Sequence, residues 1–587
     1  MRRWLLACLA VGVLVTACQP TKPPPPPTLS VSCTAAAGSS VPGNDPLRSG
    51  WYPDQPGLAP VSSGGCAFGQ LFAAPVNGQV YAQPVVDVGT NTLLVATEAN
   101  WIYGLDPATG AQKWARNLGV SWNASDLGCQ DLTPTVGVTS TPAIDSATHT
   151  AYFFSKTYAS GTSGPAAWYA HAVDIANGTE RAGFPLLIQG AAANDPLTSF
   201  EAAHHLQRPG LLLMGGVVYA GFGSLCDIPD YRGWVVGVST AGAIKTIWTD
   251  EALQPGSPGG GIWQSGGRLV SDRPGQILLV SGNGKHATLP TPGATPPLTL
   301  GQSVIRLAVQ PSGALLAVDF FTPYNADEQD FRDLGVGAPL GLPSAFFGTP
   351  SIPNLAVVTS KSGDVYLLDR DHLGGYKQGP GGTDAVINTY PDTGWTFASP
   401  AVWPGDGGYV YIPNIKLFGS PDDYFTAYRY GLDANGRPAL TVAGQSSDVF
   451  GLGASSAIIT SDGTKSGSAL VWVTDRAGTS AQLRAYDPVA VNGVLNPRGK
   501  WPLGDGTKFN TPTVSAGRIY VGTHDGHVLA FGAQTSASSQ SESPANPETP
   551  APAPTTTGPA TTATSTAPST LTTTTSSTIS VPIGPRP

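Results

Sequence analysis

The sequence is poor in charged residues and has no surplus of positive charge. Only 12% of its 587 residues are Asp, Glu, Lys or Arg, and the formal net charge is −9. A protein that binds nucleic acid needs a basic surface to meet the phosphate groups. We therefore do not expect nucleic acid among its partners.

Several signatures of catalysis are also missing. The chain has no Gly-x-Ser-x-Gly motif, no phosphate-binding loop and no Rossmann glycine pattern between a strand and a helix. No two of its 6 cysteines are adjacent or spaced as Cys-x-x-Cys. This excludes a thioredoxin-like dithiol and a cysteine-cluster zinc site.

The apolar run that opens the chain is too short to span a bilayer. It extends from Trp4 to Ala17 after two arginines, as in a secretory signal. It ends in Val-Thr-Ala-Cys, which resembles a bacterial lipobox. The resemblance implies that residues 1–17 are a signal peptide and that Cys18 carries lipid, palmitate included, which anchors the protein to the cell membrane or an outer membrane. The alternative is an ordinary signal peptide with a chance cysteine.

Composition divides the rest of the chain into three parts. Residues 18–32 contain a run of five prolines and predict a stiff, extended spacer. Residues 533–587 are almost wholly Ser, Thr, Pro and Ala, which predicts a disordered tail. Residues 33–532 are rich in Gly and apolar residues, and we expect them to form the folded domain.

The folded part is built from a repeated unit of short strands. In Gln79–Leu118, apolar and aromatic runs alternate with turns rich in Gly, Asn, Asp and Pro, which indicates antiparallel strands. A small or polar residue followed by Pro or Ser opens each of eight such units. The eight copies start at Gln83, Thr141, Arg208, Trp263, Thr349, Ser399, Ser455 and Thr511.

This repetition predicts an all-β propeller of four-stranded blades, with eight blades favoured and seven as the alternative. The last copy has only three strands, whereas an extra strand-like piece, Phe68–Phe72, precedes the first copy. We expect that piece to complete the last blade and close the ring, so that no sheet edge is left free.

Four cysteines remain once the signal and the lipid-bearing Cys18 are set aside. An oxidising compartment favours two disulfides among them, and three pairings can be drawn. We favour Cys33–Cys66, which would clamp the N-terminal segment, and Cys129–Cys226, which would join loops of neighbouring blades.

One stretch of the first unit is similar to a known repeat. The sequence WIYGLDPATGAQKW, Trp101–Trp114, resembles the repeat of pyrroloquinoline-quinone-type propellers, and further pieces such as Ser360–Gly375 resemble it too. The resemblance implies a tight turn formed by Asp106 and Gly110, with Trp114 docked between adjacent blades. It covers most of the region from Phe68 to Phe531 and identifies an architecture rather than an activity.

The quinoprotein alcohol dehydrogenases of this superfamily hold their quinone in the central channel. The resemblance implies an adjacent-cysteine disulfide, a tryptophan floor and a Ca²⁺ ion bound by Glu, Asn and Asp. The cysteine pair is absent here, although other quinoproteins lack it as well. Trp263 and Trp395 are candidates for the floor, but propeller tryptophans are mostly structural. Pyrroloquinoline quinone and Ca²⁺ therefore stay open as cofactors.

Two polar clusters are candidate metal sites. Glu201 and His204 stand in the stretch EAAHH, and Asp319, Asp327 and Asp330 lie in an acidic stretch that also resembles a family loop. Carboxylate and imidazole groups ligate metals, but neither stretch matches the spacing of H-E-x-x-H or of an EF-hand. Hydrated surface groups explain both clusters without a metal.

These observations favour a monomeric, non-catalytic envelope protein that binds a protein or ligand across a propeller face. A quinone-dependent alcohol or sugar dehydrogenase is the first alternative, since a fold alone does not assign a function. A polysaccharide-binding module is the second, suggested by aromatic residues expected to be exposed: Trp122, Trp168 and Tyr231.

Overall fold

The computed structural model describes residues 29–33, 45–256, 258–327, 333–391, 394–415, 424–476 and 480–535. All of them belong to one compact unit that ends at Ser539. The expected signal peptide, Cys18 and the tail after residue 535 lie outside the described residues. No helix in the described ranges is long and apolar enough to cross a membrane.

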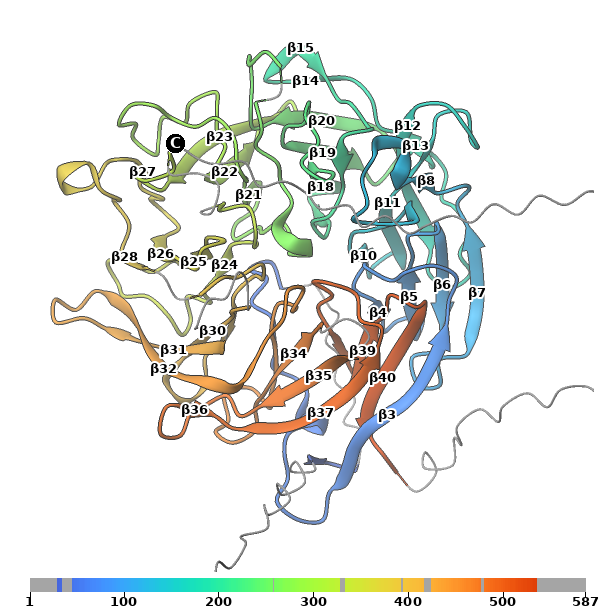
Figure 1. Cartoon of the computed structure of the whole chain (residues 1–587), viewed down its shortest axis with the longest axis vertical. Helices are drawn as coiled ribbons and strands as arrows, with labels where there is room; N and C mark the ends of the chain where they lie inside the picture. The colour runs from blue at the N-terminus through green and yellow to red at the C-terminus, as the bar shows by residue number, and fades with distance from the viewer. Residues whose placement is uncertain are drawn as a thin grey trace, which may run out of the picture. The chain divides into compact units, whose positions relative to one another are not determined.

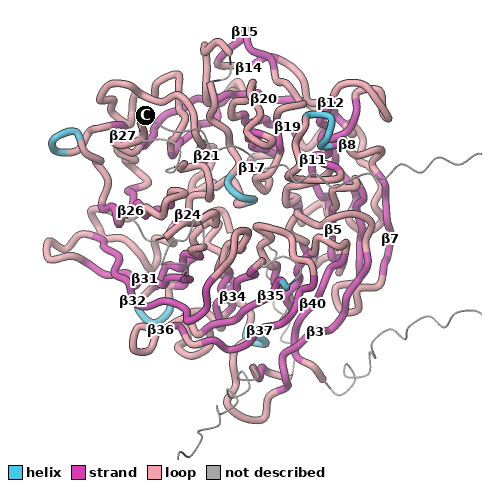
Figure 2. The backbone as a smooth tube through the Cα atoms, viewed as in Figure 1, coloured by secondary structure: helices cyan, strands magenta, loops and turns pink. Residues whose placement is uncertain are grey.

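Eight sheets of four or five strands follow one another around a ring in the described part of the chain (Figure 1). The protein is thus an eight-bladed β-propeller and not a seven-bladed one. Within the described ranges, helical structure is confined to short 3₁₀ turns, and loops connect the blades (Figure 2). The 3₁₀ turns are η1 (Pro56–Leu58), η2 (Ala124–Leu127), η3 (Gln264–Gly266), η5 (Pro380–Gly382) and η6 (Gly405–Gly407).

The first four blades contain the following strands. Blade 1 has β4 (Val85–Asp87), β5 (Thr92–Ala96), β6 (Trp101–Leu105) and β7 (Gln112–Asn117). Blade 2 has β10 (Ala143–Asp145), β11 (Thr150–Tyr158), β12 (Ala166–Asp174) and β13 (Leu186–Leu187). Blade 3 has β16 (His205–Leu206), β17 (Leu212–Met214), β18 (Val217–Ser224), β19 (Trp234–Ser239) and β20 (Ile244–Thr249). Blade 4 has β21 (Gln276–Val280), β22 (Val304–Val309), β23 (Leu315–Thr322) and β27 (Gly375–Tyr376).

The other four blades complete the ring. Blade 5 has β24 (Leu340–Gly341), β25 (Leu355–Thr359), β26 (Val365–Asp369) and β28 (Asn388–Tyr390). Blade 6 has β29 (Ala401–Trp403), β30 (Tyr409–Pro413), β31 (Tyr424–Leu432), β32 (Pro438–Val449) and β36 (Val494–Leu495). Blade 7 has β2 (Trp51–Tyr52), β33 (Ile458–Thr460), β34 (Leu470–Asp475), β35 (Ala481–Tyr486) and β37 (Pro497–Gly504). Blade 8 has β1 (Ser30–Val31), β3 (Cys66–Pro75), β38 (Thr513–Ser515), β39 (Arg518–Gly522) and β40 (His527–Ala533). Two small ribbons, β8 (Trp122–Asn123) with β9 (Thr135–Val136) and β14 (Ala191–Ala192) with β15 (Asp195–Ser199), lie between blades.

The core of the ring lies between neighbouring blades. Every residue of β5 and β34 is buried. This follows because each blade packs between two neighbouring blades, one against each of its faces. Leu278 and Val280 of blade 4, for example, pack against Ala356 and Val358 of blade 5. Strands buried on both faces favour continuous β-branched and aliphatic runs over alternation, which is the pattern that the sequence shows.

The N-terminal strand β3 lies beside the C-terminal strand β40 in blade 8 (Figure 1). The antiparallel register runs from Phe68 opposite Ala533 to Pro75 opposite His527. The ring of Phe68 packs edge-on against Trp501 of blade 7, with the ring centroids 4.7 Å apart. Blade 8 therefore takes its strands from both ends of the described chain.

The turn of blade 1 has the geometry that the repeat motif implies. Asp106 accepts hydrogen bonds from the backbone N–H groups of Ala108 and Thr109, at 2.9 and 3.0 Å. Gly110 closes the turn with a φ of 74°, which favours glycine. Trp114 donates from Nε1 to the carbonyl of Ile175 in blade 2, at 2.9 Å, and so connects the two blades.

Two of the eight expected repeat copies are misplaced. Residues Trp263–Ser265 belong to the short helix η3 and its cap, whereas the inner edge of blade 4 is formed by Val270, which pairs with Leu278. Thr349–Ser351 lies in the turn before β25, whereas β24 is the inner strand of blade 5. The motif is short, and turns offer the same residue types.

The four cysteines that were expected to pair form two disulfides. Cys33 is bonded to Cys66, and Cys129 is bonded to Cys226. The first joins the end of β1 to the start of β3. The second ties the connection between blades 1 and 2 to a loop of blade 3, so it reaches past blade 2.

Candidate functional site

A segment before blade 1 lies along the inner strands of four other blades. The carbonyls of Pro46, Leu47 and Ser49 accept hydrogen bonds from Ser271, Gly341 and Val402, which belong to blades 4, 5 and 6. The segment then continues as β2, which pairs in parallel with β33 of blade 7. We call Asp45–Asp54 the inner segment. Its backbone groups are satisfied by the ring, so its path is fixed by the blades it crosses.

Two residues of the inner segment shape its turn. Asp45 accepts from the backbone N–H groups of Leu47 and Ser49, at 2.9 and 2.6 Å. Gly50 has a φ of 68°, and a Cβ at this position would lie 3.0 Å from the Cβ of Ala401. Only glycine fits this turn without strain. Arg48 lies within this turn and lines the cavity described next.

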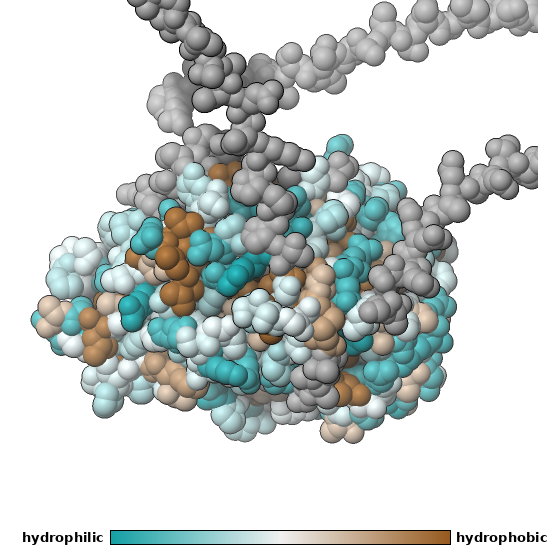
Figure 3. Space-filling model, turned by 90° about the horizontal axis from the view of Figure 1, so that it is seen from below, coloured by the Kyte–Doolittle hydropathy of each residue, from teal (hydrophilic) through white to brown (hydrophobic). Residues whose placement is uncertain are grey.

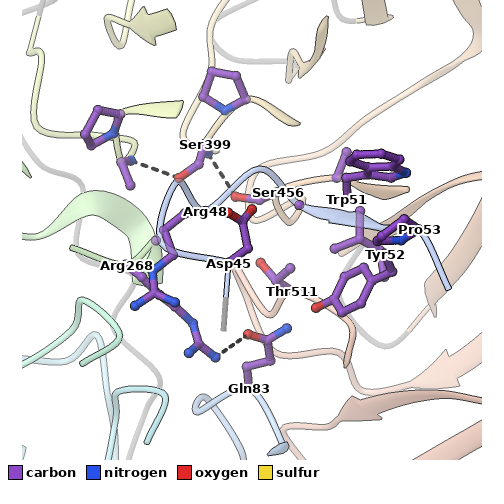
Figure 4. A pocket seen from close by; sticks show the side chains of 18 of the residues that line it. Asp45, Arg48, Trp51, Tyr52, Pro53, Gln83, Arg268, Ser399, Ser456 and Thr511 are labelled. Atoms are coloured by element: carbon purple, nitrogen blue, oxygen red, sulfur yellow. Dashed lines mark hydrogen bonds between the residues drawn. The ribbon is translucent and has the colours of Figure 1, made fainter. Parts of the chain in front are cut away.

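A cavity of about 430 Å³ lies between the inner segment and the starts of the inner strands (Figure 4). Its walls come from six blades and include Gln83, Arg268, Ala338, Ser399, Ser456 and Thr511. Because these positions open successive blades, the cavity lies at the centre of the ring. Its volume is in the range of a small-molecule site.

Two arginines project into this cavity. Arg268 donates from Nη2 to Oε1 of Gln83 at 3.0 Å, and Gln83 is fixed by its own bond to the carbonyl of Pro512 (Figure 4). Arg48 donates from Nε to the carbonyl of Leu269 at 3.2 Å. Both guanidinium groups are held at defined positions by acceptors that are themselves fixed.

The protein interior disfavours both charges. Burial, together with the neighbouring Arg268, lowers the pKa of Arg48 to about 9, whereas Asp45 and Tyr52 oppose the shift. Burial likewise lowers the pKa of Arg268 to about 10, with Tyr52 opposing. At neutral pH both side chains are still charged. The cavity therefore concentrates positive charge at the centre of a protein whose net charge is −9.

A second buried layer adjoins the cavity. Arg208 is 3% exposed and donates from Nη2 to the carbonyl of Phe509 at 3.2 Å. A Cβ at Gly266, in the cavity wall, would lie 2.2 Å from its guanidinium. Glu98 is 1% exposed, and burial raises its pKa to about 7 although Gly137, Thr139 and Arg208 oppose the shift. Arg208 thus separates the cavity from a buried carboxylate.

The tryptophans proposed as a cofactor floor take part in packing. Trp263 contacts Phe397 and Phe509 edge-to-face, with centroid distances of 6.5 and 5.4 Å. Trp395 packs against the core between blades 6 and 7. Neither residue lines the cavity. The cavity thus fits the carboxylate groups of a quinone through its arginines, but it provides no stacking face from these two residues.

The predicted metal ligands do not converge. Glu201 and His204 contact each other at 2.9 Å in the loop before β16. Asp319 accepts from the backbone of Phe320 and Leu373, whereas Asp327 lies near His286 and Lys377. Asp330 lies outside the described residues. Within the described ranges, no three His, Cys, Asp or Glu side chains are grouped as metal ligands.

The polar stretch around His205 differs from the expected hydrated surface loop. His205 is 1% exposed, and its Nε2 accepts from Nε1 of Trp234 at 3.0 Å. Two of the aromatics proposed to bind polysaccharide are also buried, since Trp122 and Trp168 are 3% and 0% exposed. Both tryptophans pack in the core between blades 2 and 3, so they offer no sugar-binding surface.

The sequence gives no family assignment by itself. No protein-family model matches it, and no curated protein matches it detectably. Solved structures do resemble the fold. A quinohemoprotein alcohol dehydrogenase from Comamonas testosteroni matches with a TM-score of 0.52 at 14% identity, over 79% of this chain and 76% of that one.

Two further solved structures also resemble the fold of this chain. A second quinohemoprotein alcohol dehydrogenase, ADHIIG from Pseudomonas putida HK5, matches with a TM-score of 0.52 at 13% identity, over 83% of this chain and 78% of that one. A europium-containing methanol dehydrogenase matches with a TM-score of 0.50 at 13% identity, over 79% of this chain and 93% of that one. At such identities the likeness shows the fold alone. The chain therefore shares the propeller fold of these structures.

Proposed function

We propose that the protein is a non-catalytic propeller, anchored to the cell envelope through lipid on Cys18, that binds a partner protein along the outer edge of blade 6. Its two disulfides are typical of proteins outside the cytoplasm. The observation that carries the proposal is the outer edge of blade 6.

The outer strand of blade 6 is incompletely paired. β32 pairs with β31 from Pro438 to Val449, but it pairs with β36 only at Gln445 and Ser446. The part of β32 before Gln445 therefore has no neighbouring strand on its outer side among the described strands. An open edge of this kind accepts an added strand from another protein. In Figure 1 the β31–β32 hairpin (orange) extends outward from the ring.

The same edge exposes several aliphatic side chains. They are between 39% and 61% exposed and comprise Leu432, Val442, Val449, Val491 and Val494. On the face seen in Figure 3, brown groups are separated by hydrophilic residues. Exposed aliphatic residues gathered at an open sheet edge favour a protein partner over a glycan or a soluble substrate.

The centre of the ring supports a role without quinone chemistry. The resemblance places a quinone in the central channel, but here the inner segment crosses four blades at that position. The side chains of Trp263, Phe397 and Phe509 pack on one another instead of forming an open platform. These three side chains therefore offer no open stacking face, although the cavity beside the inner segment has room for a small molecule.

Partner binding is tested with one charged substitution on blade 6 and one elsewhere. Val442→Lys places a charge on the proposed edge, and Val88→Lys does the same at a residue of blade 1 that is 46% exposed. Immobilised wild-type protein and the two variants are incubated with an envelope extract. We expect the same polypeptides on wild type and Val88→Lys, and their loss on Val442→Lys. Equal retention by all three, or by none, would contradict the proposal.

A quinone-dependent dehydrogenase is the second candidate function. Two observations favour it: the likeness of the fold and the cationic cavity at the centre of the ring. It is tested by titrating the purified protein with pyrroloquinoline quinone, with and without Ca²⁺, and then adding an alcohol or aldose with a redox dye. We expect no dye reduction. Stoichiometric quinone binding followed by substrate-dependent reduction would establish the dehydrogenase instead.

A further inference from the structure

Four exposed leucines lie together beside blades 3 and 4. They are between 54% and 92% exposed and comprise Leu197, Leu253, Leu289 and Leu298. Single exposed aliphatic residues are normal on a folded protein, whereas several gathered in one place mark an interaction surface. We call these four residues the leucine rim.

Hydrogen bonds hold the segments of the leucine rim together. Asp195 accepts the backbone N–H groups of Leu197 and Leu253, at 3.3 and 2.9 Å. The backbone N–H of Ala252 donates to the carbonyl of Leu298 at 3.0 Å. In Figure 1 the β14–β15 ribbon, which carries Leu197, lies beside β20 at the outer side of the ring. The rim is therefore one surface and not four scattered residues.

A groove of about 760 Å³ adjoins the leucine rim. Its walls include Leu289 itself, together with Gln254, Pro297 and Thr299, which are chain neighbours of other rim residues. None of the described wall residues belongs to a strand, so the groove offers no sheet edge to which another strand could be added. Grooves without such an edge receive a helix through its apolar face.

One rim leucine is not explained by the fold. Leu253 has a φ of 57°, in the left-handed region that disfavours residues with a Cβ. Glycine or asparagine would form this turn with less strain. The side chain is also more than half exposed, so it contributes little to the core. A strained and exposed leucine indicates a use outside the fold itself.

A lysine in the groove wall is not paired with a carboxylate of the described residues. The Nζ of Lys285 donates to Oε1 of Gln254 at 3.1 Å. Lys285 influences the nearby Glu251, but burial raises the pKa of Glu251 to about 10, so this carboxyl is neutral at pH 7. Asp327, which also lines the groove, faces Lys377 at 3.8 Å. Lys285 is thus available to an acidic side chain of a partner.

From these features we propose that the groove and the leucine rim bind an amphipathic helix of a partner protein. Aliphatic side chains at every third or fourth position of the helix pack on the rim, and an acidic side chain beside them pairs with Lys285. This surface shares no residue with the outer edge of blade 6. The proposal therefore goes beyond the proposed function, and the two are tested independently.

The probe is a designed helical peptide of about 20 residues, with leucines on one face and glutamates beside them. Its binding to the full-length protein at pH 7 is measured by fluorescence anisotropy, with a scrambled peptide of the same composition as control. Leu298→Ser is compared with Leu316→Ser, because the two leucines are 55% and 53% exposed and only Leu298 belongs to the rim. We expect saturable binding by wild type and Leu316→Ser, and about fivefold lower affinity in Leu298→Ser.

A charge exchange tests the role of Lys285. Lys285→Glu should weaken the binding of the glutamate peptide by about two- to fivefold, and it should favour a peptide with lysines in place of the glutamates. Lys245→Glu is the matched control, since Lys245 is an exposed lysine of β20 that does not line the groove. We expect it to change neither affinity.

Several outcomes would overturn the proposal. They are the absence of saturable binding by wild type, equal binding of the helical and scrambled peptides, and equal affinity in Leu298→Ser and Leu316→Ser. Vesicles of phosphatidylglycerol and sedimentation of the protein alone test the other occupants of such a surface. If Leu298→Ser abolished vesicle binding or self-association while the peptide did not bind, the rim would serve a bilayer or a second copy instead.

Discussion

Replacing Lys156 with methionine should remove a pH dependence from the stability of the ring. Lys156 is 0% exposed, and its Nζ donates to the carbonyls of Ala203 and His205 at 2.7 and 3.1 Å. The Nζ also lies 4.1 Å from the centre of the Trp122 ring. Burial lowers the pKa of Lys156 from 10.5 to about 7, although Glu201 opposes the shift.

The sign follows from proton linkage. Between pH 7 and 10.5 the unfolded chain holds the Lys156 proton and the folded chain has lost it. The unfolded state therefore binds more protons, so the free energy of unfolding rises with pH in this window and is constant below it. One proton contributes roughly 1.4 kcal/mol per pH unit, so from pH 7 to 9 we expect a gain of about 2 kcal/mol in wild type.

The assay is guanidinium chloride unfolding at pH 7, 8 and 9, for wild type and Lys156→Met. The two proteins share every other titrating group, so the difference between their pH slopes isolates Lys156. We expect the gain with pH to be absent in Lys156→Met. Parallel slopes would refute the reasoning, because they would mean that Lys156 is charged in the folded state throughout this range.

Two other predictions concern the connections between blades. Trp114→Ala should lower the free energy of unfolding by about 2 to 3 kcal/mol in denaturant titrations, because it removes the bond to Ile175 and the packing on Gly178; an unchanged midpoint would contradict the docking role. Joint replacement of Cys129 and Cys226 by serine opens a loop of 97 residues and should cost about 2 to 4 kcal/mol, measured as a melting temperature below that of wild type under non-reducing conditions; an unchanged melting temperature would contradict it.

The blades were predictable because their signals are local. Short β-branched and aliphatic runs such as Thr92–Ala96 became strands that are buried on both faces. The disulfide pairing was only a preference among three arrangements, since pairing depends on distances that the sequence does not contain. The repeat motif failed at Trp263 and Thr349 because turn residues imitate the start of an inner strand.

The centre of the ring could not be predicted from the sequence. The inner segment Asp45–Asp54 has no periodic pattern, and its partners lie hundreds of positions later in the chain. Arg48 and Arg268 become neighbours only through that path. The burial of Trp122 and Trp168 is likewise a property of the contact between blades, because an exposed and a buried tryptophan look alike in a strand.

The shared blade has a consequence for how the protein matures. Because β3 and β40 form one sheet, the ring stays open until nearly the whole folded region has left the ribosome and reached its final compartment. Until then, blades 1 to 7 expose the face that blade 8 covers, and β3 offers an unpaired edge to other chains. Export in an unfolded state and protection by a chaperone on arrival would both serve this order of assembly. A chain that stops shortly before His527 would be able to form seven blades but not a closed ring.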